Sequence, residues 1–205
     1  MGSLTQDELS VIYGSLLGDG YMRIIPGRKS AFLEINHSIK ARDYVDSKFS
    51  LLKNLCNQPP KERSGNEGRI AYRFFTKSDS RFNGIYKMFY RNNRKIVPDI
   101  KLNPMILAIW FMDDGSRSRD SDVYLNTQQF SLSDQRKLLK MLLELKIKAR
   151  LNKDKKYYRI RILKESIKHF NQLINPFVIS SMRYKLSYNP VETWANARSV
   201  SNSKH

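Results

Sequence analysis

Two aspartates, Asp19 and Asp114, each close an apolar segment and are each followed by a glycine. If both segments are helices, each carboxylate lies at a helix C-terminus, where the partial negative charge of the helix disfavours an acid. If the two helices also pack side by side, the acids converge, and their repulsion raises a pKa unless a cation neutralises them. Hard divalent ions such as Mg²⁺ take oxygen ligands of this kind and can assist phosphodiester hydrolysis. The pattern therefore points to a metal-dependent hydrolase, against the plainer alternative of two core helices that end in turns.

Both segments carry signals for where a helix begins and ends. The first opens with Thr5 and Glu8, the spacing of a capping box. The second opens with Asn103 as N-cap and Pro104 in the first turn. We expect Gly20 and Gly115 to stop the helices by taking the left-handed geometry after the last turn. The first segment offers small residues for close packing and the second offers only Ala108, so we expect an asymmetric helix pair; the small residues of the first segment are Gly14, Ser15 and Gly18.

The order of elements after each Asp-Gly repeats along the chain. Strands are expected at 32–37 and 123–129, then amphipathic helices at about 38–56 and 131–146, then strands at 69–76 and 156–163. Last come two helices that open with Phe82-Asn83 and Phe170-Asn171. Short strands at 21–23 and 61–64 are inferred from the pattern alone. Each half therefore reads helix, strand, strand, helix, strand, strand, helix.

This order divides the chain into two units and a tail. We predict an N-terminal repeat at 1–98, a C-terminal repeat at 99–190 and a polar tail at 191–205, with the connection between halves near 97–103. The repetition of an apolar helix ending in Asp-Gly within the same element order favours function over coincidence.

Charge is the second strong signal. The 37 Lys and Arg residues against 19 Asp and Glu give a net charge of +18, which is typical of a protein that binds a polyanion. A ribosomal-type protein or a merely soluble basic surface is the alternative, and charge does not separate DNA from RNA. The single cysteine, Cys56, excludes disulfides within the chain and a four-cysteine zinc site. The longest apolar run, Met105 to Met112, is too short to span a bilayer, so we expect no membrane partner.

The two Asp-Gly segments, Ile12 to Gly20 (IYGSLLGDG) and Leu107 to Gly115 (LAIWFMDDG), resemble the signature of the LAGLIDADG homing endonucleases. Three later stretches also resemble that family, especially its single-chain members: RKIVP at 94–98, VYLNTQQF at 123–130 and MRYKL at 182–186. The similarity covers about residues 8–188. Ser15 and Trp110 stand where the signature has leucine and Asp113 stands where it has alanine, but both terminal Asp-Gly pairs are kept.

The resemblance implies roles for particular residues. Asp19 and Asp114 would be paired metal-binding acids, and Lys95 and Lys185 would flank the two scissile phosphates and stabilise developing charge. His37 and Gln129 would order solvent beside them. The backbone carbonyls of Gly18 and Asp113 would join the metal shell. The implied metal is Mg²⁺, with Mn²⁺ as a substitute and Ca²⁺ supporting binding without cleavage.

The fold that the resemblance implies is α+β: two pseudo-symmetric αββαββα repeats form a saddle of antiparallel sheets over DNA, with the motif helices packed at the centre. Strand alternation then assigns faces. Tyr157, Arg159 and Arg161 would face the major groove, while Tyr158, Ile160 and Ile162 would face the helices. In the first half, Arg69 and Arg73 alternate with Ile70, Tyr72 and Phe74. The further candidates for DNA contact are Arg23, Arg28, Lys29, Glu34, Asn36, Arg117, Arg119, Asn126 and Gln128.

The expected function is therefore cleavage of a long asymmetric site in double-stranded DNA by a monomer. An RNA-binding intron maturase would use the same basic sheets without needing Asp19 or Asp114. A catalytically silent DNA-binding regulator is the other alternative, although retention of both acids and both lysines argues against it. An intracellular and organellar location, in a mitochondrion or chloroplast, follows from the resemblance alone.

Overall fold

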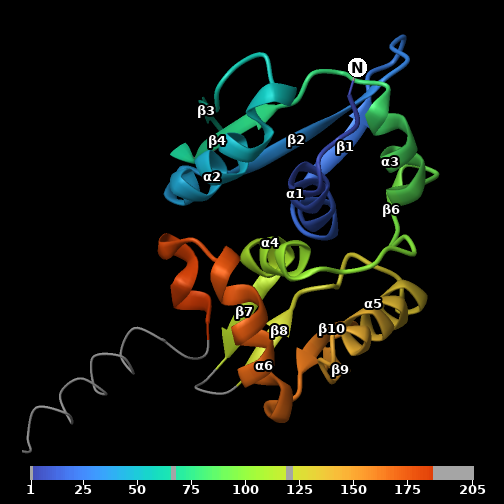
Figure 1. Cartoon of the computed structure of the whole chain (residues 1–205), viewed down its shortest axis with the longest axis vertical. Coiled ribbons are helices and arrows are strands. Elements are labelled where there is room, and N and C mark those ends of the chain that lie inside the picture. The colour runs from blue at the N-terminus through green and yellow to red at the C-terminus, as the bar shows by residue number, and fades with distance from the viewer. Residues whose placement is uncertain (1, 66–67, 119–121, 187–205) are drawn as a thin grey trace, which may run out of the picture.

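The computed structural model describes residues 2–65, 68–118 and 122–186. It contains two four-stranded antiparallel sheets whose strands follow the same order, β1-β2-β4-β3 and β7-β8-β10-β9. Figure 1 shows helices α1 (Gln6–Leu17) and α4 (Pro104–Asp114) packed against each other at the centre, between the two sheets. The α+β fold with a repeated arrangement of sheet and helices is thus confirmed.

The first half follows the expected element order. Strands β1 (Tyr21–Ile24), β2 (Ala31–Ser38), β3 (Lys61–Ser64) and β4 (Ile70–Phe75) form its sheet. Helix α2 (Arg42–Leu52) follows β2 and is flanked by short 3-10 turns at Ile39–Ala41 and Lys53–Leu55, so the regular helix is shorter than 38–56. Helix α3 (Arg81–Phe89) leads into a two-stranded hairpin of β5 (Tyr90–Arg91) and β6 (Arg94–Lys95).

The second half repeats the order, but its second strand is shorter than expected and its last α-helix begins earlier than expected. Its sheet consists of β7 (Gly115–Ser118), β8 (Asp122–Leu125), β9 (Ala149–Asp154) and β10 (Tyr157–Ile162). The strand expected at 123–129 ends at Leu125, because the side-chain amide of Gln135 bonds to the carbonyls of Thr127 and Phe130 and holds this segment in a turn. Helix α5 (Leu132–Glu144) begins at the N-cap Ser131.

The last α-helix does not open where the sequence suggested. Helix α6 spans Lys164–Ile174, so Phe170 and Asn171 lie in its second half and not at its start. Both side chains are buried, which explains why they looked like a repeated landmark. Two 3-10 helices, Asn175–Phe177 and Ser180–Lys185, then carry the chain back to the centre. The tail predicted at 191–205 lies outside the described residues.

The two central helices begin as expected but end differently. Thr5 and Glu8 form both bonds of the capping box, and the Asn103 side chain accepts from the Ile106 amide. The expectation that Gly20 and Gly115 take left-handed geometry is wrong, because only Gly27 and Gly68 have positive φ among the described glycines. Glycine is required at these positions because there is no room for a side chain. A Cβ at Gly20 would lie 2.8 Å from the Ser15 carbonyl oxygen, and one at Gly115 would overlap Phe111.

The core is continuous across the two halves. The buried residues include one face of each sheet, the inner faces of the helices and nearly all of α4, where Ile106 to Met112 are buried in sequence. The connection at 97–103 belongs to this core, since Val97, Ile100 and Leu102 are buried. Within the described ranges, none of the helices is long and apolar enough to cross a membrane.

Candidate active site

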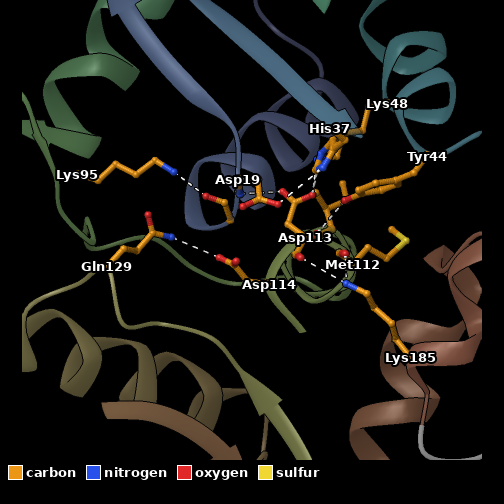
Figure 2. A network of polar contacts seen from close by, with 12 residues as sticks. Asp19, His37, Tyr44, Lys48, Lys95, Met112, Asp113, Asp114, Gln129 and Lys185 are labelled. Carbon is orange, nitrogen blue, oxygen red and sulfur yellow. Dashed lines mark hydrogen bonds and ion pairs between the residues drawn. The ribbon is translucent and has the colours of Figure 1, made fainter. Parts of the chain in front are cut away.

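The close packing of α1 against α4 brings Asp19 and Asp114 to the same end of the helix pair. Gly14 allows the approach, because a Cβ there would lie 2.7 Å from the Cβ of Ile109. Gly18 does the same opposite Asp113. Figure 2 shows the two acids on neighbouring helix ends, with lysines on both sides. The sequence expectation of an asymmetric helix pair agrees with this geometry, since the small residues lie on α1 and the larger ones on α4.

The two acids differ in their surroundings. The Asp19 side chain is 50% exposed, whereas Asp114 is largely buried. Burial, together with repulsion from Asp19 and Asp113, raises the pKa of Asp114 to about 7 against the opposing effect of Lys95 and Lys185. The donor set of two carboxylates with an unmet negative charge fits a hard divalent cation.

Each half contributes one lysine beside its own motif helix. Lys95 Nζ, on β6, donates to the Gly18 carbonyl at 2.6 Å. Lys185 Nζ, in the last 3-10 helix, donates to the Met112 carbonyl at 2.6 Å and lies 3.3 Å from the Asp113 carbonyl. Burial lowers the pKa of both lysines, that of Lys95 to about 8. The two carbonyls that the sequence assigned to a metal shell thus lie within reach of ammonium groups.

His37 and Gln129 occupy matched places next to the acids. His37 Nδ1, at the end of β2, lies 3.7 Å from Asp19 Oδ2. Gln129 Nε2 donates to Asp114 Oδ2 at 3.3 Å. The structure therefore brings all six residues expected to be catalytic to one region: Asp19, Asp114, Lys95, Lys185, His37 and Gln129.

Asp113 takes a place that the sequence did not predict. Its side chain is fully buried and is 2.7 Å from Lys48 Nζ, a lysine that is itself only 2% exposed. The sequence carries a signal for this lysine. Lys48 lies on the same face of α2 as the buried residues Tyr44, Val45 and Leu52. Plotting 42–52 as a helix therefore places a lysine on the face that packs into the core.

A cleft of about 850 Å³ opens beside Asp19. It is lined by Lys95 and Gln129 and by the hairpin of β5 and β6. This hairpin was also missed, although Asn92 and Asn93 between two short basic strands favour a two-residue turn with positive φ, which both residues adopt. The hairpin is what positions Lys95.

Some of the residues expected to touch DNA lie on the open faces of the two sheets, and others lie in the segments beside the strands. In the first sheet, Arg23 and Arg73 both approach Glu34 at 3.6 Å, while Tyr72 and Phe74 point into the core. Asn36 is paired with Arg73 in the register of β2 and β4 and is exposed. Arg69 precedes β4 and is exposed, as are Arg28 and Lys29 between β1 and β2.

In the second sheet, alternation is as expected, with Ile160 and Ile162 buried and Tyr157 exposed. The Arg159 guanidinium lies 3.9 Å from the centre of the Tyr124 ring, and Arg161 pairs with Asp122 at 2.5 Å.

Three other candidates in this half bond within the protein: Arg117 to the Leu186 carbonyl, Asn126 to Ser116 and Gln128 to Asp154. Because β8 ends at Leu125, neither Asn126 nor Gln128 lies within a strand. Arg119 lies outside the described residues.

Comparison with known proteins agrees with this geometry. The model of the LAGLIDADG DNA endonuclease family matches residues 9–170. The cytochrome b mRNA maturase bI2 of Saccharomyces cerevisiae is 34% identical over 91% of this chain, and the chain spans about half, 48%, of that relative. DNA endonuclease I-ChuI of Chlamydomonas applanata is 29% identical, with 90% of this chain and 96% of that protein covered.

Among solved structures, the homing endonuclease I-WcaI bound to its DNA recognition sequence matches with a TM-score of 0.83 and 25% identity, covering 92% of this chain and 89% of that one. The sequence match thus agrees with the structure, which has two motif helices that end in acids and two repeated sheets. The chain belongs to the LAGLIDADG DNA endonuclease family.

Proposed function

We propose that this chain is a site-specific endonuclease that cuts both strands of a long, asymmetric duplex with the help of a divalent cation. The observation that carries the proposal is the pair of acids on adjoining helix ends, flanked by two partly buried lysines. Asp19 and Asp114 would hold the cation, which supplies positive charge to the attacking and leaving oxygens. Lys95 and Lys185 would stabilise charge that develops on the two scissile phosphates.

The other residues of the site would prepare water and substrate. His37 and Gln129 each lie next to one acid, where their ring or amide can orient a solvent molecule. The exposed faces of the two sheets, with arginines on strands β1, β4 and β10, would read base edges and phosphates. Gly18 and Asp113 would offer their carbonyls to the cation when the lysines move to the phosphates.

Mg²⁺ is the proposed cation, with Mn²⁺ as a substitute and Ca²⁺ supporting binding without cleavage. I-DmoI, which shares the fold at 12–13% identity and TM-scores of 0.52–0.55, was solved in complex with DNA in the presence of Mn, Mg or Ca. The donor chemistry of this chain is consistent with the same class of ion, because all candidate ligands are oxygens: the carboxylates of Asp19 and Asp114 and the carbonyls of Gly18 and Asp113.

RNA binding as an intron maturase is the second candidate. It is favoured by the names of two relatives, the bI2 maturases of Saccharomyces cerevisiae and Debaryomyces hansenii, which are 34% and 32% identical. A maturase needs the basic surface but not the two acids. A third relative, the probable intron-encoded endonuclease 1 of Wickerhamomyces canadensis at 29% identity, supports an intron origin for this chain, and we propose an organelle as its compartment.

One experiment separates the two functions. A randomised duplex library is incubated with the protein and Mg²⁺, cleaved ends are recovered and sequenced, and binding to folded intron RNA is measured in parallel. The endonuclease proposal predicts enrichment of one long asymmetric site. Tight binding to the RNA with no enriched cleavage product would replace it with the maturase function.

A further inference from the structure

A buried carboxylate crosses between the two halves on one side of the site only. Asp113 extends from α4 over Gly18, the residue directly after α1, where a larger residue would collide with it. The position that corresponds to Asp113 in the first motif is Gly18 itself, directly before Asp19. The helix pair therefore carries one such carboxylate, and Figure 2 shows it on the side of Asp19 and His37.

Lys48 makes this burial possible. Its ammonium lies 2.7 Å from Asp113 Oδ1 and 4.4 Å from the centre of the Tyr44 ring, and the Tyr44 hydroxyl donates to the Ile109 carbonyl of α4. Both charges are almost fully removed from solvent. A buried pair of this kind is weak evidence for stability, because desolvation offsets much of the attraction, but it fixes geometry.

The fixed carboxylate is hydrogen-bonded to Asp19, and His37 lies near both acids, although its Nε2 makes no hydrogen bond. Asp113 Oδ2 accepts from the Asp19 backbone amide at 3.3 Å. His37 lies between the two acids, with Nε2 3.4 Å from Asp113 Oδ1 and Nδ1 3.7 Å from Asp19 Oδ2. Asp114 has a different support: Gln129 donates to its carboxylate, and its backbone carbonyl accepts from Asn126.

We propose that Lys48 and Asp113 are positioning residues for Asp19 and not for Asp114, and that the pair sets the ratio of the two strand-nicking rates. The proposal rests on the proposed nuclease function. The two acids are held by unlike networks, and each lies near the carbonyl bound by a different one of the two lysines proposed to flank the scissile phosphates. Loss of one network would therefore misplace one acid by a fraction of an ångström and slow one cut more than the other. A purely structural pair would instead affect both cuts alike.

Three variants separate positioning from stability. Lys48→Met leaves the charge of Asp113 buried without its cationic partner and is expected to lower the melting temperature strongly. The double variant Lys48→Met with Asp113→Ala removes both charges, keeps a Cβ opposite Gly18 and is expected to melt closer to the wild type. Arg81→Met is the matched control: it breaks the ion pair with Asp79 in the same half, away from the motif helices.

Two readouts follow in the double variant. Hydrogen exchange of the Asp19 amide, measured without metal or DNA, should become faster while exchange of the Asp114 amide is unchanged. On a duplex labelled separately on each strand, the ratio of the two nicking rates should change by about tenfold. Arg81→Met should lower the melting temperature and leave both the exchange of Asp19 and the ratio as in the wild type.

The outcomes are distinguishable. Equal slowing of both strands, or unchanged exchange at Asp19, would overturn the positioning role. A wild-type protein that cuts neither strand would count against the proposed nuclease function, and the exchange of the Asp19 amide would then decide on positioning alone.

Discussion

Asp19 and Asp114 have matched positions in the sequence but not in their electrostatics. Asp114 lies in the less exposed place, where burial and two neighbouring acids hold its pKa near 7. Lys95, which partly opposes this effect, is itself held near pKa 8 by burial. The site therefore contains one acid, Asp114, and one base, Lys95, whose pKa values lie close to neutral pH, which is common where charged ligands are bound.

This arrangement predicts that divalent metal binding depends on pH. A cation needs the ionised carboxylate, so each pH unit below 7 should weaken binding about tenfold. The raised pKa of Asp114 favours the metal-free folded state at low pH, and this stabilisation is lost as pH rises through about 7. Mg²⁺ should therefore raise the melting temperature more at pH 8 than at pH 5.5.

Thermal denaturation with and without Mg²⁺ at the two pH values provides the test, with Asp114→Asn as the control that should remove the difference. An equal rise at both pH values in the wild type would show that Asp114 does not bind the ion.

Sequence alone could predict the residues that recur at matched positions. Both acids, both lysines, His37 and Gln129 were found through the repeat and the resemblance, and the structure brings them together. Lys48 has no counterpart in the second half, so comparison of the two halves did not reveal it. Its partner Asp113 stands where the family signature has alanine, so comparison with the signature did not reveal the pair either. Only the placement of Lys48 on the apolar face of α2 hinted at it.

At the scale of elements, the site depends on how closely α1 and α4 approach. A Cβ added at Gly14 would lie 2.7 Å from the Cβ of Ile109 and 2.8 Å from the carbonyl oxygen of Ile106. Gly14→Ala should therefore force the helices apart and destabilise the protein by about 1–3 kcal/mol.

Gly84→Ala is the matched control. Gly84 lies in α3 with nothing within 4 Å of an added Cβ, so alanine should stabilise the protein by about 0.4–1 kcal/mol through a less flexible unfolded chain. Urea denaturation of both variants measures the two changes. Similar free energies of unfolding for the two would contradict the packing argument.

The elements were predicted where local patterns decide them and missed where tertiary contacts do. Alternation located β4 and β10 to within a residue at each end. The end of β8 could not be found from alternation, because Gln135 of a later helix holds Thr127 and Phe130 in a turn. The role of Gly20 and Gly115 was also misjudged, since close contacts of the backbone, not its dihedral angles, select glycine there.

The whole molecule combines a net charge of +18 with two arginine-bearing sheet faces. Duplex binding should fall steeply with salt, with a slope of about −0.9 on a log–log plot for each neutralised phosphate. Arg159→Ala should weaken binding and reduce the slope by about one unit if it contacts phosphate, or relax specificity at one position if it contacts a base.

Lys140→Ala, on the exposed side of α5, should change neither property. Filter binding across a salt series measures both variants, and an affinity that is flat between low and moderate salt would contradict the electrostatic account.

The two halves also present unlike residues to the site, with His37 against Gln129 and Glu34 against Asn126. A single chain therefore replaces the two-fold symmetry of a dimer, and we expect a monomer that prefers a non-palindromic sequence. Sedimentation of the protein with its selected site gives the stoichiometry. Two chains per duplex, or a perfectly palindromic selected site, would exclude this arrangement.

In the proposed function, Asp19 and Asp114 hold the cation that drives cleavage. Nicking of each labelled strand in Mg²⁺ is measured for Asp19→Asn, Asp114→Asn and the double variant, with filter binding of the same duplex in parallel. Asparagine keeps the size of the side chain but removes its charge, so each single variant should lose cleavage while binding stays close to that of the wild type. Normal cleavage of both strands by the double variant would contradict the account.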